Sequence, residues 1–193
     1  MANKHHKKLN GMRVAILATN GFEQAELEEP RKALRAAGAE TVLLSPKTGT
    51  LQGMKHDQKG SEFAVDMKLQ DANPEEFDAV LLPGGAQNAD QLRVEEAAKR
   101  FVQAIDQAKK PIAVICHGPW LLVSAGLVKG RELTSYHTIQ SDIRNAGCKW
   151  TDQETVRDKN WVSSRQPDDI PAFNKAMIEL FGEAREGAAT SRN

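Results

Sequence analysis

Short apolar runs alternate with segments of helical periodicity along most of the chain. Four runs are almost wholly apolar, which is typical of strands buried on both faces: Val14–Ala18, Thr41–Leu44, Ala79–Leu82 and Ile112–Ile115. Apolar residues at helical spacing predict helices over Glu26–Ala37, Val94–Lys109, Pro119–Ala125, Ile139–Ala146 and Pro171–Phe181. Strands that alternate with helices predict an α/β fold with a mostly parallel central sheet covered on both faces.

The remaining segments complete the predicted organisation. Residues 47–68 contain glycines and short β-prone pieces, so we expect short strands or a hairpin there. Both ends of the chain are polar. We predict a disordered basic tail over residues 1–10, a single domain over residues 11–182 and a polar tail over residues 183–193. His5 and His6 fall in the first tail, where we interpret them as solvated side chains and not as metal ligands.

Charge and cysteine content narrow the class of protein. The chain has 26 Lys and Arg residues and 26 Asp and Glu residues, and this zero net charge argues against a nucleic-acid partner. No apolar run approaches the ~18 residues of a membrane span, and no signal-peptide pattern is present, so we expect no membrane partner and a cytoplasmic location. Two cysteines are too few for a disulfide framework or a zinc site of the CxxC kind.

Motifs for common cofactors are missing from the sequence. There is no phosphate-binding P-loop, no GxGxxG fingerprint and no HExxH zinc helix. We therefore expect no cofactor and no metal. In parallel sheets of this kind, the chemistry collects at the carboxyl ends of the strands. That rule directs attention to residues 19–26, 83–90 and 116–120.

The segment around Cys116 has the layout of a nucleophile elbow, with a strand, a sharp turn that carries the nucleophile, and a helix. The predicted strand Ile112–Ile115 leads directly into Cys116, His117, Gly118 and Pro119. Proline suits the first helical position, and a cysteine near the positive end of a helix dipole has its thiolate favoured. His117 follows at once and is a candidate base or cation. We therefore predict a strained, reactive and partly accessible thiol at Cys116.

The alternative is that Cys116 is a small buried apolar residue at the end of a strand. The His, Gly and Pro that follow it favour a functional thiol. Cys148 lies between Gly147 and Lys149, with no base beside it and no elbow around it. We interpret Cys148 as structural.

Two other strand ends carry groups that can converge on the thiol. Gly84 and Gly85 follow a predicted buried strand, and successive glycines let backbone N–H groups turn toward a developing oxyanion. Glu23 and Glu26 are three residues apart, so both can face the same side of a helical turn. A protonated carboxyl would donate a hydrogen bond to the sulfur, and an ionised one would raise the pKa of the cysteine; the sequence leaves both states open.

Nearly the whole chain, from about residue 12 to residue 181, resembles the PfpI/ThiJ superfamily. The matching stretches are GFEQAEL at residues 21–27, NPEEFD at 73–78, LPGG at 82–85, ICHGP at 115–119, LTSY at 133–136, NAG at 145–147 and NWVSSR at 160–165. The superfamily includes intracellular cysteine peptidases and stress-linked deglycases. The resemblance implies a flavodoxin-like three-layer sandwich, similar to the class I glutamine-amidotransferase domain and assembled as a homo-oligomer, a dimer or larger.

The resemblance also implies roles for particular residues. It assigns Cys116 as the nucleophile, His117 as the base and Glu26, with Glu23 nearby, as the carboxyl partner. It places the oxyanion site at the backbone of Gly84, Gly85 and His117, with Gly118 beside it. In the PfpI-type peptidases an acid from a neighbouring subunit completes a triad, and its place in this chain is Asp90. Tyr136 matches a tyrosine beside the pocket. His137 follows it and is either a wall of the pocket or a catalytic group.

Several functions fit these residues. The first is a stress-response enzyme with a cysteine nucleophile, which acts as a hydrolase on peptides or as a deglycase or glyoxalase on methylglyoxal and its protein adducts. The second is a redox sensor that uses oxidation of the same cysteine. The third is a chaperone-like protein without turnover. We expect the partners to be further copies of the chain and a small aldehyde, a peptide or a modified protein.

Overall fold

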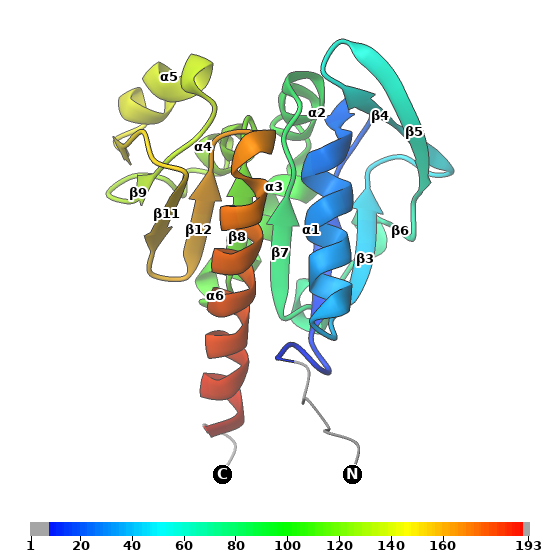
Figure 1. Cartoon of the computed structure of the whole chain (residues 1–193), viewed down its shortest axis with the longest axis vertical. Helices are drawn as coiled ribbons and strands as arrows, with labels where there is room; N and C mark the ends of the chain where they lie inside the picture. The colour runs from blue at the N-terminus through cyan, green and yellow to red at the C-terminus, as the bar shows by residue number, and fades with distance from the viewer. Residues whose placement is uncertain (1–7, 191–193) are drawn as a thin grey trace.

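The computed structural model describes residues 8–190. Within them a seven-stranded sheet runs in the order β11-β12-β8-β7-β1-β3-β6 (Figure 1). Its strands are β1 (Arg13–Leu17), β3 (Glu40–Ser45), β6 (Met67–Lys68), β7 (Ala79–Leu82), β8 (Ile112–Ile115), β11 (Thr155–Asp158) and β12 (Trp161–Ser164). Neighbouring strands pair in parallel, except that β11 and β12 are antiparallel. The predicted mostly parallel sheet is confirmed.

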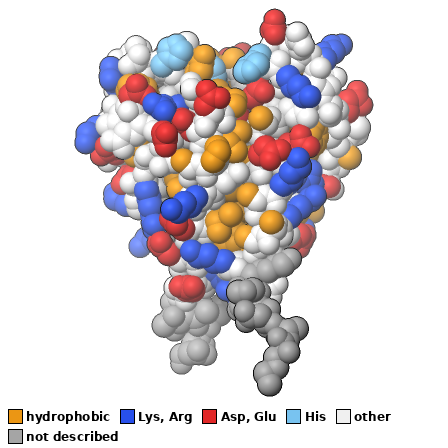
Figure 2. Space-filling view, in the orientation of Figure 1, with side chains coloured by type: hydrophobic (Ala, Val, Ile, Leu, Met, Phe, Trp, Pro, Cys, Tyr) orange, Lys and Arg blue, Asp and Glu red, His pale blue; other side chains and the backbone are white. Residues whose placement is uncertain are grey.

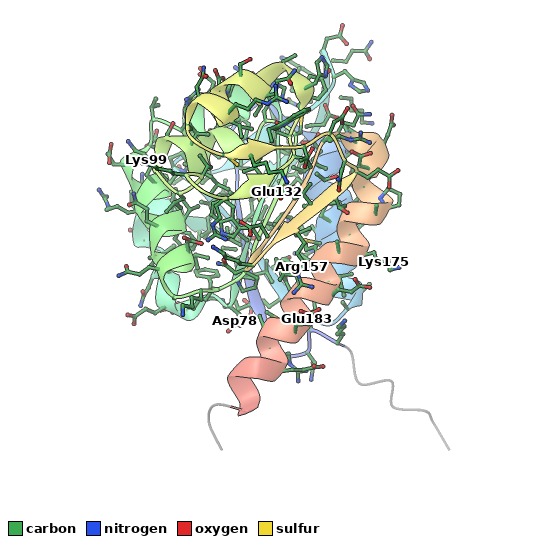
Figure 3. The ribbon with its side chains drawn as sticks, turned by 90° about the vertical axis from the view of Figure 1, so that its left-hand side faces the viewer. Asp78, Lys99, Glu132, Arg157, Lys175 and Glu183 are labelled. Carbon is green, nitrogen blue, oxygen red and sulfur yellow. The ribbon has the colours of Figure 1, made fainter. Side chains whose placement is uncertain are left out.

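Helices cover both faces of this sheet. They are α1 (Gln24–Ala36), α2 (Ala86–Leu92), α3 (Glu96–Gln107), α4 (Pro119–Ser124), α5 (Gln140–Asn145) and α6 (Ile170–Thr190), with short 3-10 helices η1 (Leu69–Asp71), η2 (Pro74–Glu76), η3 (His137–Ile139) and η4 (Pro167–Asp169). Figure 3 shows α3, which carries Lys99, and α6, which carries Lys175, on opposite sides of the sheet. The chain is therefore the three-layer sandwich that was predicted.

The alternation of side chains along the buried strands produces two cores. On β1, Ala15 and Leu17 pack in the core beneath α3 and α4, whereas Val14 and Ile16 pack in the core beneath α1 and α6. The central strands β1, β7 and β8 are apolar on both faces because helices cover each face, which explains their continuous apolar sequences. Burial of this surface is the main force that fixes the order of the elements.

Two smaller sheets flank the sandwich. One contains β2 (Phe22–Glu23), β4 (Thr50–Lys55) and β5 (Gln58–Ala64), so the hairpin predicted within residues 47–68 is confirmed. Its β4 strand pairs in parallel with β2, which ties the hairpin to the start of α1. The other sheet is a parallel pair of β9 (Glu132–Leu133) and β10 (Lys149–Trp150), which the sequence analysis did not predict.

The structure corrects both predicted tails. The last helix continues to Thr190, so residues 183–190 are helical and the predicted polar tail at 183–193 is wrong for them. Residues 8–10 form a turn in which Leu9 is fully buried and its N–H donates to the Ala37 carbonyl at 2.9 Å. The disordered tail predicted for residues 1–10 is therefore wrong at that end, and His5 and His6 lie outside the described residues. No helix in the described chain is long and apolar enough to cross a membrane.

Candidate active site

The three loops singled out from the sequence meet at the carboxyl edge of the sheet. Strands β1, β7 and β8 are adjacent and parallel, so the segments that follow them converge. They enclose a pocket of about 520 Å³ lined by Gly21, Glu23, Glu26, Met54, His56, Gly85, Ala86, Gln87, Cys116, His117, Tyr136, Gln166, Pro167 and Asp168. Histidine side chains gather at this end of the molecule in Figure 2.

Cys116 sits on a strained turn between β8 and α4. Its φ angle is +63°, a left-handed conformation that costs a residue with a side chain about 1–2 kcal/mol. The strain predicted from the elbow pattern is confirmed. The predicted accessibility is wrong, because only 7% of the residue is exposed. Cys116 lines the pocket, so a ligand has to enter the pocket to reach the sulfur.

Backbone N–H groups face the Cys116 sulfur from two sides. The N–H groups of Gly85 and His117 both hydrogen-bond to it. The Gly84 N–H is turned away and donates to Glu26 Oε2 at 2.8 Å. Of the three backbone donors predicted for the oxyanion site, Gly84, Gly85 and His117, only Gly85 and His117 are therefore available.

Gly118 does not reach the pocket. A side chain there would lie 2.8 Å from the Leu82 carbonyl oxygen and 2.9 Å from the Ile115 carbonyl oxygen. Gly118 is not one of the described residues that line the pocket, so its predicted substrate-binding role is not supported. A glycine is required at position 118 because the backbone of the turn passes very close to the ends of β7 and β8.

Glu26 is a fully buried carboxyl beside the sulfur. Its Oε2 accepts the Gly84 N–H, and its side chain interacts with the Cys116 thiol. Oε1 is also buried and has no nitrogen or oxygen partner. Burial raises the pKa of Glu26 to about 8, against 4.5 for an ordinary glutamate, and the negative charge of Glu23 adds to the shift. The carboxyl is therefore protonated at neutral pH and has a hydrogen to donate.

The environment of Cys116 differs from the one expected for a cysteine at a helix start. Burial raises the pKa of the thiol, and an ionised Glu26 raises it further. Since Glu26 holds its proton at neutral pH, that second contribution is absent there, and the carboxyl donates toward the sulfur instead. The thiolate consequently depends on a nearby base and on the hydrogen-bond donors around it, and less on the dipole of the short helix α4.

His117 is placed to be that base. Its Nδ1 lies 3.2 Å from the Cys116 sulfur, and its Nε2 lies 3.3 Å from Thr138 Oγ1. The ring packs against Trp120 and Tyr136, with centroid distances of 5.4 and 5.0 Å. Burial lowers the pKa of His117, and the charge of His137 lowers it further, so the imidazole is neutral at pH 7. A neutral ring can accept the thiol proton.

Glu23 and His137, the other two candidates, lie in different places. Glu23 lines the pocket, and its Oε2 accepts the backbone N–H of His56 at 3.0 Å, which fixes the tip of the β4–β5 hairpin. His137 is exposed, and its ring centroid is 4.5 Å from that of Tyr136. It lines a separate pocket of about 250 Å³ beside the main one. His137 is not among the described residues that line the Cys116 pocket, so neither a wall role nor a catalytic role in that pocket is supported, and its role stays a prediction.

Asp90 does not join the site of its own chain. The segment that follows the glycine pair is helix α2 and not a loop, and Asp90 is exposed on it. It is not among the residues that line the Cys116 pocket. A catalytic role for Asp90 requires a second copy of the chain and stays a prediction.

The sequence analysis missed several residues of the pocket. Met54 and His56 come from the β4–β5 hairpin, and residues 166–168 come from the segment before α6. His56 has a φ angle of +58° in the turn, a conformation in which glycine is usual. This angle is visible only in the structure, so no pattern in the sequence pointed to His56. Asn88, fully buried, also went unnoticed: it accepts the Thr19 N–H at 2.7 Å and donates to the Gly84 carbonyl at 3.0 Å, joining two of the loops.

Gly84 is packed tightly between the Glu26 carboxyl and the Cys116 elbow. A methyl group there would lie 2.6 Å from the Cys116 Cβ and closer still to Glu26 Oε2. We expect Gly84→Ala to lower the free energy of unfolding by about 3 kcal/mol, because the buried carboxyl and the elbow have to move apart. Urea denaturation measures this. Gly187→Ala is the control, since a methyl group meets nothing within 4 Å there. Equal stability of the two variants would contradict the packing described here.

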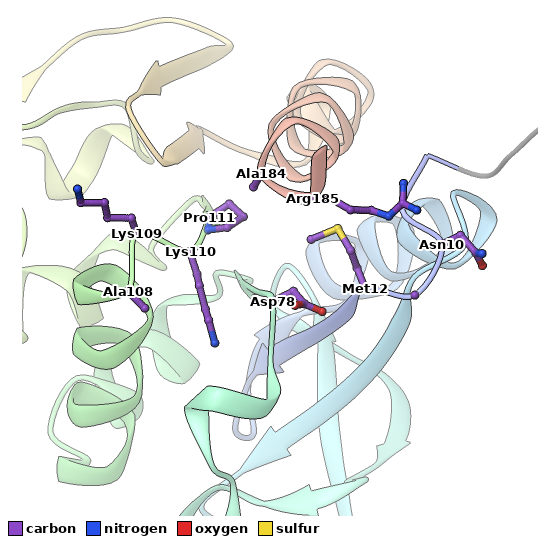
Figure 4. Close-up of a pocket in the computed structure, with 10 residues that line it drawn as sticks. Asn10, Met12, Asp78, Ala108, Lys109, Lys110, Pro111, Ala184 and Arg185 are labelled. Atoms are coloured by element: carbon purple, nitrogen blue, oxygen red, sulfur yellow. The ribbon is translucent and has the colours of Figure 1, made fainter. Parts of the chain in front are cut away.

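A second cavity lies at the opposite end of the sheet (Figure 4). It has a volume of about 430 Å³ and is lined by Asn10, Gly11, Met12, Asp78, Ala108, Lys109, Lys110, Pro111, Ala184 and Arg185. Two of its polar side chains are used by the fold: Lys110 Nζ donates to the Pro74 and Glu75 carbonyls, and Asp78 accepts the Arg13 N–H. Among residues 8–190, no group of three His, Cys, Asp or Glu side chains could hold a metal ion. The Cys116 pocket is therefore the candidate site.

The chain is similar in sequence to several named proteins. Deglycase PfpI from Pyrococcus furiosus is 41% identical over 170 residues, which cover 88% of this chain and 99% of that protein. Protein/nucleic acid deglycase 2 from Escherichia coli is 40% identical over 172 residues, with 88% and 98% coverage. Putative cysteine protease YraA from Bacillus subtilis is 38% identical over 169 residues, with 88% and 98% coverage.

The fold has close counterparts among solved structures. A two-domain protein from Anabaena variabilis, with a DJ-1/ThiJ/PfpI-like domain and a ferritin-like domain, superposes with a TM-score of 0.84 at 33% identity. The match covers 89% of this chain and 48% of that one. The sequence model of the DJ-1/PfpI family matches residues 12–180. The chain therefore belongs to the DJ-1/PfpI family.

Proposed function

We propose that this protein is a cysteine-dependent hydrolase that acts on methylglyoxal and on the adducts it forms with protein side chains. One observation carries the proposal: the Cys116 sulfur lies 3.2 Å from a neutral imidazole, beside a protonated carboxyl and against two backbone N–H groups. These are the base, the acid and the oxyanion donors that attack on a carbonyl carbon requires. The names of the deglycase relatives support the same chemistry.

Each residue around the sulfur has a separate role in the proposed reaction. His117 Nδ1 takes the thiol proton, and the sulfur forms a bond to the aldehyde carbon while the carbonyl electron pair moves to oxygen. The Gly85 and His117 N–H groups stabilise that oxygen, and Glu26 supplies a proton to it. The hydrogen on the first carbon then moves with its electron pair to the second carbon, and the proton of the first hydroxyl passes to the second oxygen. This isomerisation yields a lactoyl thioester without an external oxidant. Water hydrolyses the thioester to lactate and restores the thiol.

Peptide hydrolysis is the second candidate, and the Cys116–His117 contact together with the name of the Bacillus subtilis relative supports it. A redox sensor fits less well, because sensor thiols are accessible and have a low pKa, whereas Cys116 is buried and its pKa is raised. Assembly into homo-oligomers, completion of a triad by Asp90 and a cytoplasmic location remain predictions from the sequence.

Product analysis of the purified protein tests the choice between these activities. We expect lactate from methylglyoxal, lactate and restored amines from methylglyoxal-treated albumin, and no cleavage of a fluorogenic peptide. Methylglyoxal-treated guanosine is a further substrate to test. The zero net charge of the chain predicts no nucleic-acid substrate, whereas the name of the Escherichia coli relative includes nucleic acid. Peptide cleavage without lactate would establish the second candidate, and absence of all products would refute both.

A further inference from the structure

The His117 imidazole has a hydrogen-bond partner on each nitrogen within its own chain. Nδ1 faces the Cys116 sulfur at 3.2 Å, and Nε2 faces Thr138 Oγ1 at 3.3 Å. The titratable groups around the ring are Cys116, Tyr136 and His137. No carboxylate is a hydrogen-bond partner of this histidine among the described residues. The hydroxyl of Thr138 therefore occupies the position where a third, orienting group would act.

The tautomer of the ring decides whether the thiol can be activated. A neutral imidazole carries one hydrogen, on either Nδ1 or Nε2. Nδ1 can accept the thiol proton only if the hydrogen is on Nε2, and a hydrogen there needs an acceptor. The Thr138 hydroxyl oxygen has lone pairs and can accept it. Once the proton has moved, both ring nitrogens carry hydrogen, and the same oxygen stabilises the positive charge.

Thr138 lies in a short segment that is anchored at Tyr136 on one side and at Ile139 on the other. The Tyr136 N–H donates to the Cys116 carbonyl at 2.9 Å, which ties this segment to the elbow. Ile139 is 1% exposed and belongs to the core beneath α3 and α4. Between these anchors, η3 presents the exposed Thr138 side chain to the outer nitrogen of His117. The contact thus comes from the fold of a single subunit and does not need a partner chain.

We propose that Thr138 is a positioning residue that accepts the Nε2 hydrogen of His117 and so keeps Nδ1 free to take the proton of Cys116. The proposal rests on the proposed function, since it concerns activation of the same thiol. The step is a proton transfer in which the sulfur keeps the electron pair of its S–H bond. Asp90 of a neighbouring subunit is not required for it.

The test measures the reactivity of Cys116 directly and does not depend on turnover. The rate at which iodoacetamide modifies Cys116 is followed from pH 4 to pH 9 by mass spectrometry of the Cys116 peptide. We expect Thr138→Val to lower the neutral-pH rate about three- to tenfold, the value of one hydrogen bond. The rate falls at acidic pH, where protonation of His117 removes the base, and this fall is the acidic limb of the profile. We expect its midpoint to shift to a lower pH by about half to one unit, because the imidazolium loses a hydrogen-bond acceptor.

Two variants separate positioning from a general structural effect. Thr138→Ser keeps the hydroxyl and is expected to retain both the rate and the acidic limb of the wild type. Thr50→Val removes another exposed hydroxyl, which donates to Glu62 on the hairpin, and is expected to change neither. A Thr138→Val profile identical to the wild type would overturn the proposal and would be expected if a partner's acid held Nε2. A Thr138→Ser rate as low as that of Thr138→Val would overturn it as well.

Discussion

Cys116→Ala is expected to lower kcat/KM for methylglyoxal by about 10³-fold or more, measured as lactate release. Cys116 is the one cysteine among the described residues that line the pocket, and without its sulfur the remaining groups can supply only binding and polarisation. Cys116→Ser is expected to be almost as inactive. A hydroxyl is a far weaker nucleophile than a thiolate, and a neutral histidine at 3.2 Å is too weak a base to ionise it substantially.

The second cysteine provides the matched control. Cys148 is 6% exposed, about as buried as Cys116 at 7%, but its thiol donates to the Arg131 carbonyl at 3.1 Å and does not line the pocket. We expect Cys148→Ala to keep kcat/KM within about twofold of the wild type and to lose about 1 kcal/mol of stability through the small cavity it creates. Turnover that survives Cys116→Ala, or disappears with Cys148→Ala, would rule out the proposed nucleophile.

The sequence was most informative where burial imposes a continuous apolar pattern. Strands β7 and β8 match their predicted bounds residue for residue, because both are covered on two faces and no polar residue is tolerated in them. The elbow was predictable for a similar reason. A sharp turn between a buried strand and a helix needs Gly118 and Pro119, and these residues stand out beside Cys116.

The missed elements are those fixed by polar or tertiary contacts. Helix α2 has the sequence AQNADQL, which shows no apolar stripe, and its buried side of Asn88, Ala89 and Leu92 is held partly by hydrogen bonds of Asn88. His56 is held at the pocket by the hydrogen bond from its backbone N–H to Glu23, which is 33 positions away in the sequence. Thr138 contacts His117 because the chain returns to the elbow 21 positions later. Local periodicity contains no information about such pairings.

Glu26→Gln is expected to change how stability depends on pH. Burial raises the pKa of Glu26 to about 8 in the folded protein, against 4.5 for an unperturbed glutamate. Below about pH 4.5 the carboxyl is protonated in both states, and its contribution to stability is fully present. As the pH rises toward 8, the unfolded chain releases this proton while the folded chain keeps it, so stability falls. The loss reaches about 4 kcal/mol by pH 8.

Glutamine is neutral at every pH, so the variant lacks this loss. The free energy of unfolding of Glu26→Gln, relative to the wild type, should therefore rise by several kcal/mol between pH 4.5 and pH 8 in urea titrations. Its turnover should fall about 10²-fold, because the amide cannot transfer the proton that the carboxyl supplies. Glu29→Gln, at a half-exposed position on α1 paired with Lys32, controls for removal of a surface charge.

The same titrations in a Cys116→Ala background separate the carboxyl from the thiol beside it. If Glu26 owes its shift mainly to burial, the pH-dependent stability difference that Glu26→Gln produces persists without the sulfur. A difference that vanishes there would mean that the proton is shared between the two side chains and that their ionisation is a property of the pair. A stability difference that stays constant from pH 4.5 to pH 8 would show an ordinary glutamate, and Glu26 could then not act as the acid at neutral pH.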